Sequence, residues 1–380
     1  MIDTPITRLK SRLALACSFA AGVALSVQTN SSLAYEINPE STIADSPTTL
    51  LGINHIALSV RDLDAALAFY QGVTGYEVIR REAVSGDVPS GTDAFDYFAA
   101  CITAQNGDFN KWDKAIGYSV RVPLGVCAGI GAWNYPMQIA CWKSAPALAA
   151  GNAFILKPSE ETPFVAHKVA ELLQAAGLPD GLFQIIHGDR DIGAALCAHP
   201  GIAKISLTGG VETGRLIMAQ SAKSLKKITL ELGGKSANIV FEDAPLDQAV
   251  EGIITSIFFN QGQVCCAGSR LFVQEGIADR LITKLKARMD QLIIGDPLDK
   301  NTDVGAINSK MQLDKITSLC KVGLDEGCEM YQAKCTLPTK GHWFKPTIFT
   351  NVSQSSRIAN EEIFGPVLAI QTFRHVDEVV

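Results

Sequence analysis

Short apolar runs alternate with helical patterns from about residue 91 to residue 380. Apolar runs typical of strands fall at 122–133, 153–158, 182–188, 204–209 and 227–234. Segments with helical spacing lie between them, at 138–150, 164–176, 192–198 and 213–221. Strands that alternate with helices in this way predict βαβ units and a parallel, doubly wound sheet. Sheets of this class bind cofactors where the ends of strands meet the starts of helices.

The beginning of the chain is organised differently. Three basic residues precede an apolar run over 13–27, and a small-x-small sequence, Ser-Leu-Ala, follows at 32–34. Residues 1–34 therefore have the layout of a secretory signal peptide, and an upstream segment that is never processed is the alternative. Residues 35–50 are rich in Ser, Thr, Pro and Asn, which predicts a linker.

A short βαβ pattern occupies residues 51–82. Residues 53–60 alternate as a strand does, 62–70 have helical spacing, and 76–79 can form a second strand. The pattern resembles the first module of the vicinal oxygen chelate, or glyoxalase-like, superfamily, in which the histidine on the first strand, here His55, is often a metal ligand. Because one ligand does not make a metal site, a structural His55 is favoured over a ligand.

Composition narrows the class of protein. Hydrophobic residues make up 47% and charged residues 19% of the 380, a globular balance that argues against disorder. The net charge is −6 and the densest basic run is KSLKK at 223–227, so nucleic-acid binding has no electrostatic support. No stretch after the first apolar run approaches the length of a membrane span. Ten cysteines occur without a CxxC pair, and no HExxH is present, so we predict no metal site.

Six segments resemble the aldehyde dehydrogenase superfamily. They are WNYP (133–136), KPSE (157–160), LTGG followed by Gly214 (207–214), ELGGK (231–235), GQVCC (262–266) and EEIFGP (361–366). They follow one another in that family's order across about residues 91–380. The resemblance implies an α/β fold with a doubly wound NAD-binding domain over 91–233 and an α/β catalytic domain over 234–380.

The resemblance also assigns the catalytic groups. It makes Cys265 the nucleophile, in a loop after a predicted helix at 246–259, where local N–H donors favour a thiolate. Cys266 is the rival for this role. It makes Glu231, at the end of the strand 227–234, the base that activates water. Asn134 and the backbone N–H of Cys265 would form an oxyanion hole. Without the resemblance, these residues read as a core cysteine, a surface glutamate and a turn residue.

The cofactor segments depart from GxGxxG, which is absent. Gly209 and Gly210 end a strand and open a helix near Thr213, where small residues let N–H groups approach a pyrophosphate. Many family members have serine at the position of Gly210. The family's adenine-ribose ligands match Lys157 and Glu160, and Trp133 belongs to the same set of cofactor contacts.

Glu362 and Phe364 match the residues that contact the other end of the cofactor in the family, the nicotinamide ribose and the nicotinamide ring. At the ribose end, Glu160 would repel a 2′-phosphate, so the resemblance favours NAD and leaves NADP open. An exposed charge and a core aromatic are the alternative readings of Glu362 and Phe364.

Aromatic residues give the substrate prediction. Tyr135 and Trp142 match positions that line the family's substrate tunnel, and two aromatic rings can hold a quaternary ammonium group by cation–π attraction. The stretch 129–153 is especially similar to betaine-aldehyde and trimethylaminobutyraldehyde dehydrogenases. We therefore expect a small trimethylammonium or amino aldehyde as substrate, with core packing of the two rings as the alternative.

The ends of the chain bear on its activity and assembly. Family members carry segments before the match to residue 91 and after EEIFGP, so we expect a chain truncated at both ends. The later segment supplies a strand for homo-oligomerisation, which puts assembly of this chain in doubt. The alternatives to an active oxidoreductase are a truncated or fused relic that binds nucleotide at most, and a glyoxalase-like metalloprotein. NAD chemistry implies the cytoplasm, whereas the signal-like segment implies export.

Overall fold

The computed structural model describes residues 87–379, which fall into two compact units that meet between Leu232 and Gly233. Side chains are described from Gly91 onward. The signal-like segment, the linker and the 51–82 fragment with His55 lie outside the described residues.

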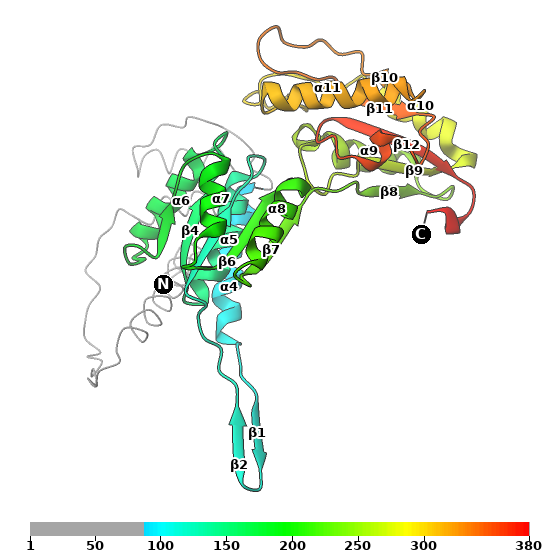
Figure 1. The fold of residues 1–380 in the computed structure, drawn as a ribbon. Helices are drawn as coiled ribbons and strands as arrows, with labels where there is room; N and C mark the ends of the chain where they lie inside the picture. The colour runs from blue at the N-terminus through cyan, green and yellow to red at the C-terminus, as the bar shows by residue number, and fades with distance from the viewer. Residues whose placement is uncertain (1–86, 380) are drawn as a thin grey trace, which may run out of the picture. The chain divides into compact units, whose positions relative to one another are not determined.

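The first unit contains a five-stranded sheet with the order β5-β4-β3-β6-β7, and all of its pairings are parallel (Figure 1). The strands are β3 (Val126–Ile130), β4 (Ala153–Lys157), β5 (Phe183–Ile185), β6 (Ile202–Gly209) and β7 (Lys227–Leu232). The chain winds from β3 out to β5 and then returns to β6 on the other side of β3. This is the predicted doubly wound sheet, and its direction reverses between β3 and β6, where open α/β sheets bind ligands.

Helices cover both faces of this sheet. They are α5 (Pro136–Ala149), α6 (Phe164–Ala175), α7 (Arg190–Ala198) and α8 (Val211–Ala222). Residues of α5 and α6 share one core cluster with Phe154 and Leu156 of β4. Residues of α7 and α8 share another with Ile205 and Leu207, and Ile155 packs against that second cluster. Successive residues of a strand point to opposite faces, so these apolar runs are buried on both sides.

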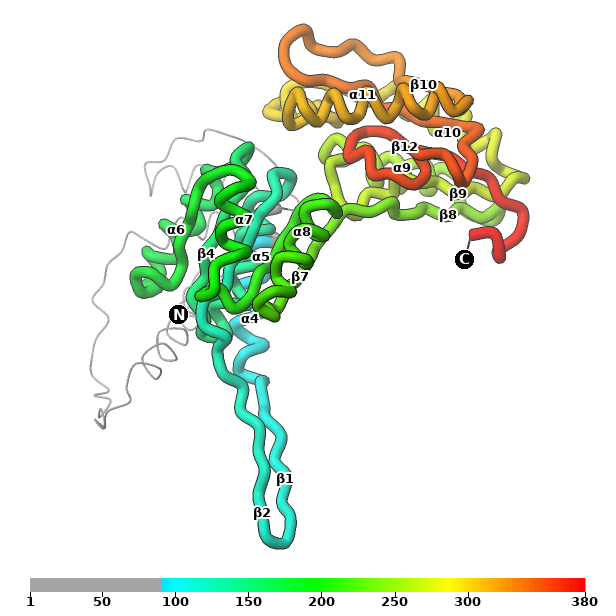
Figure 2. Tube along the Cα trace, viewed as in Figure 1, coloured from blue at the N-terminus to red at the C-terminus, as the bar shows by residue number. Residues whose placement is uncertain are grey.

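A helix and a hairpin of the first unit were not predicted. The helix α4 (Asp87–Thr103) packs against α5, so that a Cβ on Gly91 would lie 3.2 Å from Cγ of Met137. The strands β1 (Phe109–Trp112) and β2 (Ala115–Tyr118) form an antiparallel hairpin that extends away from the sheet of the same unit (Figure 2). Seven of the eight hairpin residues are exposed, so the alternation that marks a half-buried strand is missing.

The second unit contains a mixed sheet with the order β10-β11-β12-β9-β8, in which only the β10–β11 pairing is antiparallel. Its strands are β8 (Ala237–Val240), β9 (Arg270–Gln274), β10 (Glu329–Gln332), β11 (Thr347–Thr350) and β12 (Val367–Phe373). Its helices are α9 (Leu246–Phe258), α10 (Ala278–Met289), α11 (Lys310–Asp325) and α12 (Arg357–Asn360), with 3₁₀ turns η1 (Phe259–Gly262), η2 (Glu275–Ile277) and η3 (Val376–Glu378).

The central strand β12 separates the two cores of this unit. Leu368 and Ile370 belong to the cluster that contains α9 and α10, whereas Val367 and Ala369 belong to the cluster that contains α11 and α12. The second unit is therefore a sheet with helices on both faces, as an α/β catalytic domain requires.

The predicted elements differ from the observed ones mainly at their ends. β3 begins at Val126 rather than at residue 122, and β7 ends at Leu232, which leaves Gly233 and Gly234 outside the strand. α8 begins at Val211, two residues earlier than expected, because Gly210 is its N-cap. Within the described part of the chain, no helix is long and apolar enough to cross a membrane.

Candidate active site

The first unit places two predicted segments at the reversal point of its sheet. Trp133, Asn134 and Tyr135 follow β3, and Tyr135 is the N-cap of α5, whose first turn contains Pro136. All three side chains are half-buried. Proline in the first helical turn starts a helix without losing a hydrogen bond. Asn134 therefore lies in the strand-to-helix connection of the central strand.

The segment after β6 is open to an anion. Gly209 ends the strand, and the N-cap Gly210 has an extended backbone with no side-chain cap on α8. A Cβ on Gly210 would meet no atom within 4 Å, and Thr213 is exposed in the first turn. Gly214 allows α8 to approach β7, since its Cβ would lie 2.9 Å from Cδ2 of Leu232. An uncapped helix start and a glycine at the helix–strand contact fit a dinucleotide's pyrophosphate.

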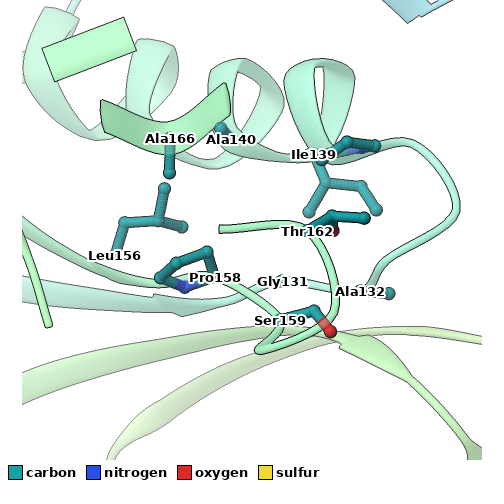
Figure 3. Close-up of a pocket in the computed structure, with 10 residues that line it drawn as sticks. Gly131, Ala132, Ile139, Ala140, Leu156, Pro158, Ser159, Thr162 and Ala166 are labelled. Atoms are coloured by element: carbon teal, nitrogen blue, oxygen red, sulfur yellow. The ribbon is translucent and has the colours of Figure 1, made fainter. Parts of the chain in front are cut away.

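The predicted ribose ligands form an ion pair at the end of β4. Lys157 is buried, and its Nζ donates to Oε2 of Glu160 and to the carbonyl oxygen of Pro158, each at 3.2 Å. The Glu160 side chain is 60% exposed, so its carboxylate remains accessible to a ligand. Pro158 and Ser159, which lie between the two residues in the sequence, line a small hollow together with Gly131 (Figure 3). The position and the donors fit a nucleotide ribose.

Glu231 is accompanied by a buried lysine. Glu231 is exposed near the end of β7, where it pairs with Thr208. Lys143 of α5 is 6% exposed, and its Nζ donates to Oγ of Ser206 at 3.0 Å. Burial lowers the pKa of Lys143 to about 8, although the charge of Glu231 raises it. In the sequence, Lys143 is recognisable only as the single charged residue of the apolar helix predicted at 138–150. It belongs to none of the six motifs.

Tyr135 and Trp142 are seven residues apart at the start of α5. Tyr135 is the N-cap, with a non-helical backbone at φ −138° and ψ 66°, whereas Trp142 lies two turns into the helix. Trp142 is 51% exposed although most of the helix around it is buried. The first unit therefore presents an exposed indole ring on the helix that follows Asn134.

In the second unit, Cys265 follows a strained turn. α9 ends at Phe258, and Asn260, Gln261 and Gly262 then adopt left-handed φ angles of 47°, 58° and 69°. Cys265 and Cys266 are both exposed in the loop that follows. The predicted N–H donors lower the pKa of the Cys265 thiol, but desolvation and Cys266 outweigh them and raise it. Desolvation favours the protonated thiol, and it could not be predicted from the sequence of the loop.

The turn with Glu362 and Phe364 lies against the glycines of ELGGK. Oε1 of Glu362 accepts a hydrogen bond from the N–H of Gly234 at 3.2 Å, and the carboxylate leaves no space for a Cβ on Gly233. Burial raises the pKa of Glu362, whereas the N–H of Gly234 and the charges of Lys315 and Lys235 lower it. The structure thus brings the glycines of ELGGK together with EEIFGP within one unit.

Lys235 of ELGGK is a further buried cation that carries no role in the sequence analysis. Burial and Arg270 lower its pKa to about 8, and the charge of Glu362 raises it. Among the described residues, no group of three or more His, Cys, Asp or Glu side chains is arranged to hold a metal ion.

Comparisons with known proteins place these segments in a family. The sequence profile of the "Aldehyde dehydrogenase family" matches residues 77–380. The betaine aldehyde dehydrogenase of Rhizobium etli (strain CIAT 652) is 49% identical over 305 residues, which are 79% of this chain and 62% of that protein. The betaine aldehyde dehydrogenase of Sinorhizobium fredii is 47% identical over 304 residues, with the same coverage. The chain thus spans 62% of the length of these relatives.

Solved structures agree with this placement. The NAD-dependent aldehyde dehydrogenase from Sinorhizobium meliloti superposes with a TM-score of 0.76 at 32% identity, covering 98% of this chain and 67% of that one. The NAD⁺ complex of the aldehyde dehydrogenase from Bacillus cereus gives 0.77 at 30% identity, covering 100% and 70%.

Proposed function

Because the chain belongs to the aldehyde dehydrogenase family, we propose that the protein oxidises an aldehyde to a carboxylate with NAD. The balanced reaction is RCHO + NAD⁺ + H₂O → RCOO⁻ + NADH + 2H⁺. The observation that carries the proposal is an exposed thiol, Cys265, in the same unit as the Glu362 turn and at the family's nucleophile position.

Cys265 supplies the covalent step. Its thiolate adds to the carbonyl carbon, and the negative charge moves to the carbonyl oxygen, where Asn134 and the backbone N–H of Cys265 donate to it. NAD, when bound, would supply the acceptor for the hydride of this carbon. The product is a thioester on Cys265. Because the pKa of the thiol is raised, we expect the rate of the first step to increase as the pH rises.

Glu231 completes the reaction. Its carboxylate takes a proton from water, the resulting hydroxide attacks the thioester, and the Cys265 thiolate leaves as the carboxylate product forms. The charge of Lys143 acts on the same carboxylate.

Each unit contains residues that the family resemblance assigns to the cofactor. In the first unit, Lys157 and Glu160 would bind the adenine ribose beside Trp133, and Gly209, Gly210 and Thr213 would bind the pyrophosphate. In the second unit, Glu362 and Phe364 would contact the nicotinamide end. The accessible Glu160 carboxylate would repel a 2′-phosphate, so we propose NAD as the preferred cofactor and NADP as a weaker one.

The proposed substrate is betaine aldehyde or a related trimethylammonium or amino aldehyde. The similarity to two betaine aldehyde dehydrogenases supports this choice. The exposed ring of Trp142, two turns into the helix that Tyr135 caps, also supports it. A quaternary ammonium over an aromatic face gains about 0.5–2 kcal/mol.

The test is NADH formation by the purified 380-residue chain with betaine aldehyde, beside a Cys265→Ser control. A second form, the extended form, carries in addition the terminal segments of the Rhizobium etli relative that lie outside the 62% matched by this chain. We expect NADH from the extended form and less from the chain alone, because the chain spans 62% of that relative. If neither form makes NADH from any aldehyde tested, the proposal is wrong.

We also propose that the whole protein assembles with a second copy of itself through the β1–β2 hairpin. Phe109, Trp112, Ile116 and Tyr118 of the hairpin are 59–72% exposed. Exposed apolar strands that extend from a sheet are a surface for pairing with another chain. Light scattering of the extended form, with and without Trp112→Lys and Tyr118→Lys, tests this point, and a monomeric extended form would refute it.

A further inference from the structure

The helix α11 directs a buried polar side chain at the turn that carries Glu362 and Phe364. Gln312 is 8% exposed, and its Nε2 donates to the carbonyl oxygens of Ile363 at 3.1 Å and Phe364 at 2.8 Å. The helix does not need this side chain as a cap, because Oγ of Ser309 already accepts from the N–H of Gln312 at 3.3 Å. The amide of Gln312 is therefore committed to a turn about 50 residues away.

The two carbonyl groups belong to the peptide units on either side of the Phe364 Cα. The orientations of these two units define φ and ψ of Phe364, whose φ is 58°. A bulky residue in the left-handed region is strained and persists only where its surroundings hold it there. One side chain, Gln312, supplies a hydrogen bond to each of the two units. Strain of this kind concentrates at ligand sites, where the conformation matters more than its cost.

Gly365, which follows Phe364, is packed closely against α11 and against the turn that contains Gly262. A Cβ on Gly365 would lie 2.5 Å from Cδ1 of Ile316, one turn after Gln312 in α11. A Cβ on Gly262 would overlap the carbonyl group of Gly365. The loop that leads to Cys265 therefore packs backbone to backbone against the Phe364 turn, and the backbone of the turn packs against the Ile316 side chain of α11. Close-packed segments of this kind transmit displacement rather than absorb it.

We infer that Gln312 is a positioning residue that holds the Phe364 turn in its strained conformation. Through the contact of Gly365 with Gly262, it also sets the position of the Cys265 loop. The inference rests on the proposed function, since that function gives the turn and the thiol their roles. It requires no contact between Gln312 and the aldehyde or the cofactor. A single helix thereby fixes the nucleophile loop and the cofactor turn relative to each other.

The test compares three variants of the 380-residue chain in a Cys266→Ala background. Gln312→Met keeps the length of the side chain and removes the donor, and Gln312→Glu places a carboxylate opposite the two carbonyl oxygens. Met311→Gln is the matched control, because Met311 is the neighbouring residue and is 73% exposed. The readouts are amide hydrogen exchange by mass spectrometry and the rate at which iodoacetamide alkylates Cys265.

With Gln312→Met, amide exchange should rise at least about tenfold over 260–266 and over 361–366, and the alkylation rate of Cys265 should change with it. Such a factor corresponds to about 1.4 kcal/mol, in the range expected for carbonyl groups that lose a buried donor. Gln312→Glu should give a larger effect at neutral pH. Exchange in β9 and α10 should stay unchanged, which separates a local effect from general unfolding. In the active extended form, KM for NAD should rise while KM for the aldehyde does not.

Unchanged exchange and alkylation in Gln312→Met would overturn the inference. A rise confined to α11 would overturn it too, since it would limit Gln312 to its own helix. Should Gln312→Met fail to fold, Gln312→Glu is read by the same two measurements. If the variants change both readouts while the parent and extended forms oxidise no aldehyde, the positioning role stands and the proposed function fails.

Discussion

Replacing Lys143 by methionine should stabilise the first unit at neutral pH. The Lys143 side chain is buried, and this burial lowers its pKa from 10.5 to about 8 against the opposing charge of Glu231. A lowered pKa means that the charged form of the lysine is less favourable in the folded chain than in the unfolded chain. The difference between 10.5 and about 8 corresponds to roughly 3 kcal/mol.

The pH dependence follows from proton binding. Below pH 8 both the folded and the unfolded chain carry the proton, so the whole cost of the buried charge is present. Between pH 8 and 10.5 the unfolded chain binds a proton that the folded chain does not, so the stability of the parent rises with pH. Methionine removes the cost but also the hydrogen bond to Ser206, which is worth about 1 kcal/mol. The net gain should be about 2 kcal/mol below pH 8, and by pH 10.5 it should turn into a loss of up to about 1 kcal/mol, because only the lost hydrogen bond then remains.

The difference in unfolding free energy between Lys143→Met and the parent can be measured by urea unfolding across a pH series that spans pH 8 and pH 10.5. Lys168→Met is the control, because Lys168 forms an exposed ion pair with Glu171 and should change stability by less than about 0.5 kcal/mol. If Lys143→Met were equally destabilising at every pH, the contacts of the ammonium with Ser206 and Glu231 would outweigh its burial, and the reasoning would be refuted.

Three further predictions concern the extended, active form. Glu231→Gln should give a burst of NADH followed by a steady rate at least about a hundredfold lower, because the thioester lacks its base; a parental steady rate would show that Glu231 is not the base. Trp142→Ala should lower kcat/KM for betaine aldehyde by about 2- to 30-fold relative to an apolar isostere, and equal losses for both aldehydes would refute the cation–π contact. Gly210→Ser, at a position where a Cβ meets no atom within 4 Å, should lower KM for NAD by about tenfold through a hydroxyl–phosphate hydrogen bond; an unchanged KM would place the pyrophosphate elsewhere.

The sheet of the first unit could be predicted because its three inner strands, β3, β4 and β6, contain no exposed residue. Each of these strands therefore appears in the sequence as a short apolar run. The hairpin could not be predicted, because nearly all of its side chains are exposed and carry no period. Element ends also escaped prediction, since the start of α8 depends on the backbone of Gly210 rather than on a pattern.

Some features of the candidate site could likewise be predicted from the sequence, and others could not. Motif positions point to Cys265, Glu231 and Asn134, whose roles stay predictions until activity is measured. Gln312 has no sequence signal, because its partners are backbone carbonyl groups about 50 residues away, which every residue type possesses. The direction of the pKa shift at Cys265 depends on desolvation, a property of the packed loop.

The central claim is that Cys265 carries the acyl group of the substrate. The most direct measurement mixes the extended Glu231→Gln form with NAD and betaine aldehyde, quenches it in acid, and maps the modified peptide by mass spectrometry. Cys265 and Cys266 are adjacent and both exposed, so fragmentation of that peptide decides between them. The account predicts a trimethylglycyl thioester on Cys265 that requires NAD, and a thioester on Cys266, or NADH formation with no acyl group on either thiol, would contradict it.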